Sequence, residues 1–301
     1  MDQETLDKLK KAGEIAAKVR WEGIRRCKEG VTYLEVMDHC EKRIVELGGR
    51  LAWAQLSPND CAAHYCPTDE DKTKCKEGDI LKIDIGVHVD GWIGDTAMSV
   101  QIATDEHKDI IKASENALKA AIKLIEPGRQ LWEIGEAQYS EAEAMGFTTV
   151  TNLCGHSLGR YKVHAGRSVP TYNNKDKTEL QEGWQIAIEP FVTSGVGRIA
   201  EKGDATVFMI PAPKPIRSPY GRKILYYVKG LQGMPFTTRH ITRKFGQSAF
   251  KVGMRELDQA GILRKYPPLR EITGAMVSQT EHTCVVGDKT VVTTRNEDDG
   301  W

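Results

Sequence analysis

The chain has 301 residues, enough to bury a large core, and its 42 Lys and Arg balance its 42 Asp and Glu. The resulting formal charge of zero excludes a globally basic nucleic-acid-binding protein. No apolar run approaches the roughly 18 residues that a membrane-spanning helix needs, so no such helix is expected.

The N-terminus and the cysteines predict a cytoplasmic protein. Met1–Thr5 begins a charged amphipathic helix and lacks the basic and apolar regions of a signal peptide. The seven cysteines are an odd number in scattered positions, which is typical of reduced thiols in the cytosol. We expect Cys61, Cys66 and Cys154 to be small buried residues.

A sequence pattern near the N-terminus recurs about 100 residues later. Lys11–Ala16 resembles Lys112–Ala117, and Glu29–Glu35 resembles Pro127–Glu133 in pattern. Each copy reads as a helix, a glycine turn and a second helix. The repeat favours an α/β fold (α+β) with a pseudo-twofold axis, although two unrelated amphipathic helix pairs remain the alternative.

A β-hairpin is the clearest local prediction. Asp90-Gly91 is a strong two-residue hairpin signal, and β-rich sequence flanks it on both sides. With this turn Gly86 pairs with Asp95, so that Asp84 points to the same face as Asp95. Such diagonal neighbours lie roughly 7–8 Å apart, and their side chains can converge. Two solvent-facing aspartates are the alternative.

Three further ionisable residues follow, each within apolar or β-branched sequence. Glycines flank His156 and allow close backbone approach, Pro190 after Glu189 indicates a strand end, and Glu281 lies in a strand-like run. Each alone is more typical of a surface residue. Several carboxylates meeting in a buried site would repel one another unless cations lay between them. The whole set therefore favours a dinuclear metallohydrolase, whose metals lie about 3.5–4 Å apart.

At this point the sequence resembles a known family, the methionine aminopeptidases. Asp84, Asp95, His156, Glu189 and Glu281 occur in the order of that family's metal-binding residues. The surrounding motifs are also similar, over about residues 5–295. These motifs are Lys82–Gly86, Gly155–Gly159, Val163–Gly166, Ile188–Pro190, Glu281–Thr283 and, around a catalytic histidine, Cys61–Pro67. The resemblance implies a pita-bread fold and removal of the N-terminal methionine from nascent polypeptides with a small second residue.

The resemblance also implies a mechanism. Two divalent metal ions (Co, Mn, Fe or Zn) are expected, with Asp84 and Asp95 on one and Asp95, His156, Glu189 and Glu281 on the other. A hydroxide bridging the metals would attack the scissile carbonyl, with Glu189 moving the proton. His64 and His164 are expected to bind the substrate and stabilise the oxyanion. We expect His88 and His282 to be structural.

The spacing of the last two ligands predicts the subtype. Glu189 and Glu281 are 92 residues apart, and the interval contains a helical pattern over 249–263. This resembles the inserted helical subdomain of type II enzymes, in their compact archaeal form. The expected organisation is a catalytic part over 1–204, the subdomain over 205–268, and final strands of the catalytic part over 269–301.

Two departures and several alternatives accompany the resemblance. Ala52-Trp53 stand where the family often has Phe-Pro, and Thr280 replaces a common aromatic residue, so the methionine pocket is expected to be reshaped. The alternatives are a metal-free protein that binds RNA or protein on the same fold, and an exopeptidase acting on X-Pro bonds. A monomer is expected, and two basic stretches are hypothesised to contact the ribosome, at 214–223 and 239–244.

Overall fold

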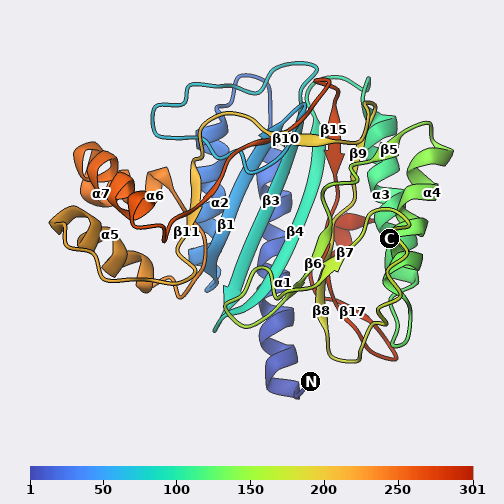
Figure 1. Cartoon of the computed structure of the whole chain (residues 1–301). Coiled ribbons are helices and arrows are strands. Elements are labelled where there is room, and N and C mark those ends of the chain that lie inside the picture. Colours follow the sequence, from blue (N-terminus) through green and yellow to red (C-terminus); the bar gives the residue numbers. More distant parts are fainter. Residues whose placement is uncertain (301) are drawn as a thin grey trace.

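A central antiparallel sheet organises the molecule, with helices behind it and on both sides (Figure 1). The computed structural model describes residues 1–300. The sheet has the order β1-β3-β4, with strands Arg50–Pro58, Ile80–Val89 and Trp92–Gln101. No helix within residues 1–300 is long and apolar enough to cross a membrane.

Helix α1 (Gln3–Arg26) packs on this sheet at very short range. Asp2 caps the helix by accepting a hydrogen bond from the Thr5 amide at 2.8 Å. Gly13 and Gly94 allow the helix backbone to approach β4, because a Cβ on Gly94 would lie 2.6 Å from the Gly13 nitrogen. The pair therefore fixes how deeply the helix sits.

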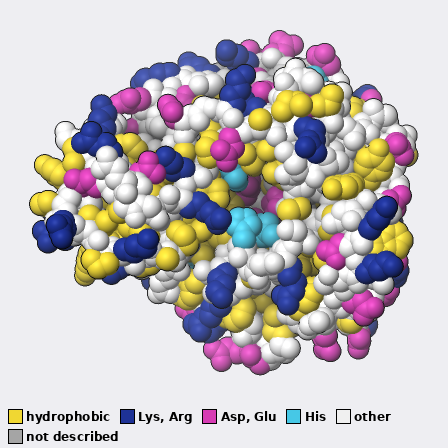
Figure 2. Space-filling model, in the orientation of Figure 1, with side chains coloured by type: hydrophobic (Ala, Val, Ile, Leu, Met, Phe, Trp, Pro, Cys, Tyr) yellow, Lys and Arg dark blue, Asp and Glu magenta, His cyan; other side chains and the backbone are white. Residues whose placement is uncertain are grey.

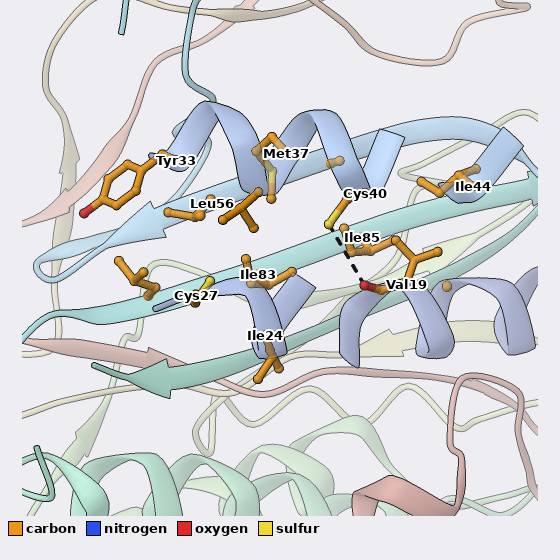
Figure 3. Packing of buried hydrophobic residues seen from close by; sticks show 14 of the residues in the cluster. Val19, Ile24, Cys27, Tyr33, Met37, Cys40, Ile44, Leu56, Ile83 and Ile85 are labelled. Atoms are coloured by element: carbon orange, nitrogen blue, oxygen red, sulfur yellow. Dashed lines mark hydrogen bonds between the residues drawn. The ribbon is translucent and has the colours of Figure 1, made fainter. Parts of the chain in front are cut away.

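Helix α2 (Tyr33–Glu46) completes the first half. Its buried face meets α1, β1 and β3 in one apolar cluster (Figure 3). Leu56 and Ile83 in the strands and Met37 in α2 are fully buried there. Each such side chain contributes about 1.5–3 kcal/mol through removal of apolar surface from water. This packing holds β3 rigid from behind.

The second half repeats the helix pair, as the sequence predicted. Helices α3 (Lys108–Lys123) and α4 (Leu131–Ala144) correspond to α1 and α2. The N-termini of α2 and α4 carry the same capping box, with Glu35 accepting from the Thr32 amide at 2.8 Å and Glu133 accepting from the Gln130 amide at 3.0 Å. This half also contains a five-stranded sheet of order β17-β16-β8-β6-β7. Its strands are Val291–Val292, His282–Val285, Gln185–Ile188, Gly155–Leu158 and Ser168–Val169.

Two small sheets connect the halves. One has the order β10-β14-β2 and the other β15-β9-β5. Their strands are Ile199–Glu201, Leu269–Glu271, Cys61–Ala63, Val277–Gln279, Phe191–Thr193 and Thr148–Thr149. Strands formed after residue 268 therefore pair with strands formed before residue 205. The segment between them is an insertion in this sheet arrangement.

The segment 205–268 contains three helices on one side of the molecule (Figure 1). Phe208, Ile224, Phe236 and Leu257 belong to an apolar cluster made of this segment's own residues. Its helices are α5 (Pro219–Lys229), α6 (Thr238–Phe245) and α7 (Gln247–Gln259), and a short sheet of order β12-β11-β13 accompanies them. These strands are Phe236–Thr237, Val207–Met209 and Arg264–Tyr266.

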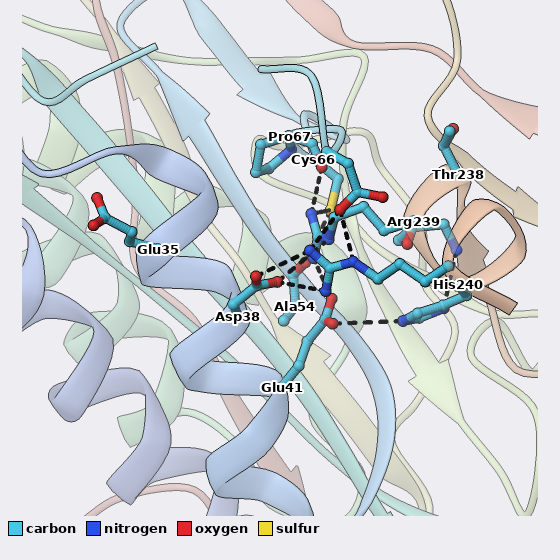
Figure 4. Close-up of polar contacts among 12 residues, drawn as sticks. Glu35, Asp38, Glu41, Ala54, Cys66, Pro67, Thr238, Arg239 and His240 are labelled. Carbon is cyan, nitrogen blue, oxygen red and sulfur yellow. Dashed lines mark hydrogen bonds and ion pairs between the residues drawn. The ribbon is translucent and has the colours of Figure 1, made fainter. Parts of the chain in front are cut away.

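A buried arginine fastens this segment to α2. Arg239 at the start of α6 is fully buried and contacts Glu41 and the Pro67 carbonyl, with the Cys66 thiol at 3.4 Å (Figure 4). Arg239 was part of the basic stretch predicted to contact RNA, and for this residue the prediction was wrong. Arg243 is likewise engaged, with Asp38 at 2.9 Å. Arg239 and Arg243 therefore attach α6 to α2 through ion pairs.

A second buried arginine fastens the C-terminal segment. Arg20 in α1 is fully buried, forms an ion pair with Asp299 in the short 3-10 helix Glu297–Asp299, and donates to the Thr96 hydroxyl at 2.5 Å. Thr96 in turn donates to the Glu281 carbonyl at 2.7 Å. The last residues of the chain are thus connected to the strand that carries Asp95.

We expect Asp299→Asn to lower the free energy of unfolding by about 3–5 kcal/mol, because it leaves the Arg20 charge buried and uncompensated. Asp298 provides a matched control, since its pair with Arg25 at 2.9 Å is about half exposed. Asp298→Asn should change stability by less than about 1 kcal/mol. Urea denaturation of both variants at pH 7 measures the difference, and equal losses would contradict the role given to Asp299.

Candidate metal centre

The β3–β4 hairpin has the predicted register. Asp90 and Gly91 form its turn with φ values of 49° and 88°, and Gly86 pairs with Asp95. Asp84 and Asp95 therefore point to the same face of the sheet. Asp95 is almost fully buried, while Asp84 is partly buried.

Strands β6, β8 and β16 supply the other three predicted residues. His156 in β6 pairs with Ala187 in β8, and Glu189 follows β8 directly. His282 pairs with Ile188 at the start of β16, so that Glu281 approaches Glu189. Because side chains alternate along a strand, His156, Glu189 and Glu281 share one face. Pro190 predicted either an edge strand or a strand end. Glu189 directly follows the end of β8, whereas the edge alternative was wrong, because β8 lies between β16 and β6.

Hydrogen bonds of the Thr283 side chain and of the Glu281 backbone join β16 and the residue before it to β4. The Thr283 hydroxyl accepts from the Asp95 amide at 2.9 Å and donates to the Asp95 carbonyl at 2.8 Å. The Glu281 amide donates to the Ala97 carbonyl at 2.9 Å. Asp95 and Glu281 thereby become neighbours although 186 positions separate them in the sequence.

All seven residues predicted for the site line one cavity of about 80 Å³. Ligand atoms of Asp95, His156 and Glu281 lie within 4.8 Å of one another. The His156 Nε2 atom is 3.6 Å from an Asp95 oxygen and 3.5 Å from a Glu189 oxygen. Figure 2 shows histidine side chains at the entrance of a hollow and acidic side chains deeper inside. The seven residues are His64, Asp84, Asp95, His156, His164, Glu189 and Glu281.

Burial and mutual repulsion shift the pKa of every carboxyl group in this cavity upward. Burial raises the pKa of Asp84 to about 6. Burial, followed by the Asp84 charge, holds the pKa of Asp95 well above its usual range. Burial and the charge of Asp95 do the same for Glu189 and Glu281. The protein alone does not stabilise four negative charges here.

The donor set fits divalent metal ions. Four carboxylates and one imidazole converge, and no Lys or Arg lines the cavity within residues 1–300. Burial lowers the pKa of His156 to about 3, so its imidazole is neutral and can act as a ligand. A divalent cation would reverse the carboxyl pKa shifts by replacing repulsion with attraction. Oxygen-rich sites with one nitrogen suit several first-row metals.

His64 and His164 stand beside these residues. The His64 Nδ1 atom is buried without a hydrogen-bond partner, and burial lowers the pKa of the ring to about 4. The Gln55 side chain fixes the loop by accepting from the His64 amide at 2.9 Å. The His164 ring centroid lies 4.5 Å from that of His156, and burial, followed by the charge of Arg264, lowers the pKa of His164. Both rings are neutral at pH 7.

The sequence did not predict the part that Trp53 plays. Its indole Nε1 donates to Asp84 Oδ1 at 2.6 Å, and Trp53 lines the cavity. Gly86 lies opposite Trp53 in the strand pairing, and a Cβ there would come 2.4 Å from the ring. Gly86 therefore makes room for the indole. A glycine inside the predicted strand was the available signal, but the register of β1 was needed to place Trp53 opposite it.

Other residues singled out in the sequence lie outside the cavity. Ala52 is buried in an apolar cluster, and the Thr280 hydroxyl bonds to Ser114 at 2.8 Å. Of the three unusual positions, only Trp53 therefore lines the site. His88 contacts the Gly91 amide at 3.2 Å and His282 contacts the Thr294 hydroxyl at 2.9 Å, consistent with structural roles. Cys61 and Cys66 are buried, whereas Cys154 is partly exposed.

Comparisons with known proteins agree with this site. Residues 7–210 match the model of "Metallopeptidase family M24". The chain is 42% identical over 292 residues to the methionine aminopeptidase of Pyrococcus horikoshii, which covers 96% of this chain and 99% of that protein.

Solved structures share the fold at lower sequence identity. A methionine aminopeptidase from Thermotoga maritima superimposes with a TM-score of 0.73 at 21% identity, covering 98% of each chain. A thermophilic Arx1 gives a TM-score of 0.83 at 17% identity, covering 97% of this chain and 91% of the other. With the carboxylate-lined cavity in place, the sequence matches show that the chain belongs to metallopeptidase family M24, among the methionine aminopeptidases.

Proposed function

We propose that this chain removes the N-terminal methionine from peptides and nascent proteins whose second residue is small. The observation that carries the proposal is the convergence of four carboxylates and a neutral imidazole on one cavity of about 80 Å³. Family membership supports the same activity. The metal-free binding protein is the less favoured alternative, because every metal-ligand position of the resemblance is occupied by a suitable residue.

The proposed ligands are Asp84, Asp95, His156, Glu189 and Glu281, which would hold two divalent ions chosen from Co, Mn, Fe and Zn. When bound, such ions make water nucleophilic at neutral pH and polarise the scissile carbonyl. The free amino group of the substrate would lie beside Asp84. An amine at that position explains why only the first residue of a chain is removed.

The chain's own residues move protons and stabilise charge. Glu189 would accept the proton that the attacking water loses and pass it to the leaving amine. A neutral imidazole keeps one N–H donor, so His64 and His164 would each donate one hydrogen bond to the scissile carbonyl oxygen, on which the oxyanion develops. The unpartnered His64 Nδ1 supports this assignment.

We assign residues 205–268 to the inserted subdomain of type II enzymes, between catalytic parts at 1–204 and 269–301. The segment's own apolar cluster supports this division. The exposed cations between Lys214 and Lys223 remain available for a ribosomal contact. A cytoplasmic monomer acting on emerging chains is the setting we propose.

The activity is tested with two peptides, Met-Ala-Ser and Met-Lys-Ser. Metal-stripped protein should cleave neither, whereas protein reloaded with Co or Mn should cleave only Met-Ala-Ser. Glu189→Gln should lower kcat by at least about 100-fold, because it removes the base. Glu182→Gln, at an exposed position nearby, is the control and should leave kcat unchanged. Chromatography of the released methionine measures cleavage by the stripped protein, the reloaded protein and both variants. Cleavage by the stripped protein would refute the metal requirement.

Metal removal should expose the repulsion among the carboxylates. The raised pKa values mean that the metal-free folded state holds protons that the unfolded chain releases, so its stability falls as pH rises from about 4. Glu281→Gln removes one charge from the cluster. At pH 8 without metal Glu281→Gln should therefore be more stable than the wild type, and at pH 4 the two should be nearly equal, because burial and the Asp95 charge raise the pKa of Glu281.

The thermal midpoint of wild type and Glu281→Gln, each with and without Mn at both pH values, checks this expectation. Added Mn should raise the midpoint of the wild type by mass action and leave that of the variant nearly unchanged. A variant less stable than wild type at pH 8 without metal would mean that the Glu281 charge is not repelled in the folded protein.

Trp53→Phe keeps an aromatic ring against Gly86 but removes the donor to Asp84. Loss of a hydrogen bond that orients a ligand typically weakens metal binding by about 10–100-fold, and we expect this range here. Trp132→Phe is the control, since that indole donates at 2.6 Å to Gln130, away from the cavity. Calorimetric titration of stripped protein with Mn measures the affinities. Unchanged affinity in Trp53→Phe would mean that the indole does not position Asp84.

A further inference from the structure

A second, larger cavity opens directly from the metal centre. Its volume is about 470 Å³, and it shares Val163 and His164 with the smaller cavity. One wall comes from the loop that carries these two residues, and the other comes from α5 and β13. We call this cavity the cationic groove, after Lys162, Lys229 and Arg264 in its lining.

The three cations of the groove are exposed and unpaired. No Asp or Glu lines the groove, and within residues 1–300 none of the three forms an ion pair. Their neighbours behave differently: Lys265, next to Arg264, pairs with Asp258 at 2.8 Å. Like charges left unpaired around one hollow add their potentials and favour a negative ligand.

Arg264 brings the positive charge of the groove close to the reaction site. It lines the groove together with His164. The Arg264 guanidinium also lies over the ring of Tyr266, 6.0 Å from its centroid, and Tyr266 lines the smaller cavity. A group bound beside Arg264 would therefore be next to the residues proposed to hold the scissile amide.

The groove also has a surface suited to an extended chain. Apolar residues line the groove together with the cations, namely Pro211, Pro213, Leu225 and Val228. A strand advances about 3.3 Å per residue, so a peptide leaving His164 needs only a few residues to pass these positions. The methionine and the second residue would occupy the smaller cavity and its entrance, which leaves the groove to the residues that follow.

We propose that the cationic groove binds acidic side chains at positions 3–5 of the substrate, so that the enzyme prefers N-termini of the form Met, small residue, then Asp or Glu. This inference rests on the proposed function. Lys162, Lys229 and Arg264 are specificity-determining residues that act on the part of the substrate beyond the scissile bond. The preference weakens at high salt, because all three charges are exposed to solvent.

Three amidated peptides test the preference: Met-Ala-Ser-Ser-Ser, Met-Ala-Asp-Asp-Ser and Met-Ala-Lys-Lys-Ser. Amidation removes a terminal carboxylate that would otherwise add charge. At 20 mM salt we expect kcat/KM to be about three- to tenfold higher for the Asp peptide than for the Ser peptide, as two exposed ion pairs allow. The Lys peptide should be worse than the Ser peptide, mainly through KM. At 0.5 M salt the three values should converge.

Lys229→Glu and Lys223→Glu form a matched pair of variants. Both residues are exposed on α5 and both substitutions change the net charge by the same amount, but only Lys229 lines the groove. Lys229→Glu should abolish or reverse the preference for the Asp peptide. Lys223→Glu should retain the preference of the wild type.

The outcomes separate this inference from the proposed function. Equal kcat/KM for the three peptides at low salt would overturn the groove proposal while leaving methionine removal intact. An equal effect of both variants would also overturn it, because net charge and not the groove would then set the preference. Failure to cleave even Met-Ala-Ser-Ser-Ser with Co or Mn present would instead refute the proposed function.

Discussion

Mutual repulsion among four carboxylates is the constraint on which this structure depends. Asp84, Asp95, Glu189 and Glu281 surround one small cavity, and the protein provides no Lys or Arg of residues 1–300 to line it. A folded chain accepts such an arrangement only at a loss of stability, since no cationic side chain compensates these charges. Local strain of this kind is expected where function requires it. The rest of the fold must hold these groups together until cations bind.

Two strand groups supply the residues, and a chain of polar contacts keeps the groups in register. Thr283 bridges β16 to the backbone of Asp95, and Thr96 bridges β4 to the Glu281 carbonyl. Arg20 supports Thr96 from α1 and is neutralised by Asp299. The acidic segment Glu297–Asp299 therefore supports the strand that carries Asp95, from which it is about 200 residues distant in sequence. Rigid support of this kind preorganises ligands that would otherwise move apart.

The sequence allowed some of this site to be predicted, and the reasons differ from residue to residue. Asp90-Gly91 fixed the hairpin register, so the shared face of Asp84 and Asp95 followed from local rules alone. The cost of burying several carboxylates indicated that His156, Glu189 and Glu281 join that pair at a metal site. Which metal each residue binds came only from the family resemblance, because nonlocal strand pairing cannot be read from spacing. The Trp53–Asp84 contact could not be predicted for the same reason, because it depends on the pairing of β1 with β3. Arg239 was misread because its burial depends on Glu41, almost 200 residues earlier.

Charge counting suggests how recognition is divided along the substrate. Two divalent ions would match the four carboxylates, leaving the smaller cavity nearly neutral, and a methionine side chain carries no charge. Size and apolar contact must then decide which first residue fits there. Beyond His164 the groove is lined by Lys162, Lys229 and Arg264, and no Asp or Glu of residues 1–300 lines it with them. Electrostatic discrimination therefore has its physical basis outside the catalytic cavity, where the chain leaving the site is still within reach of unpaired charge.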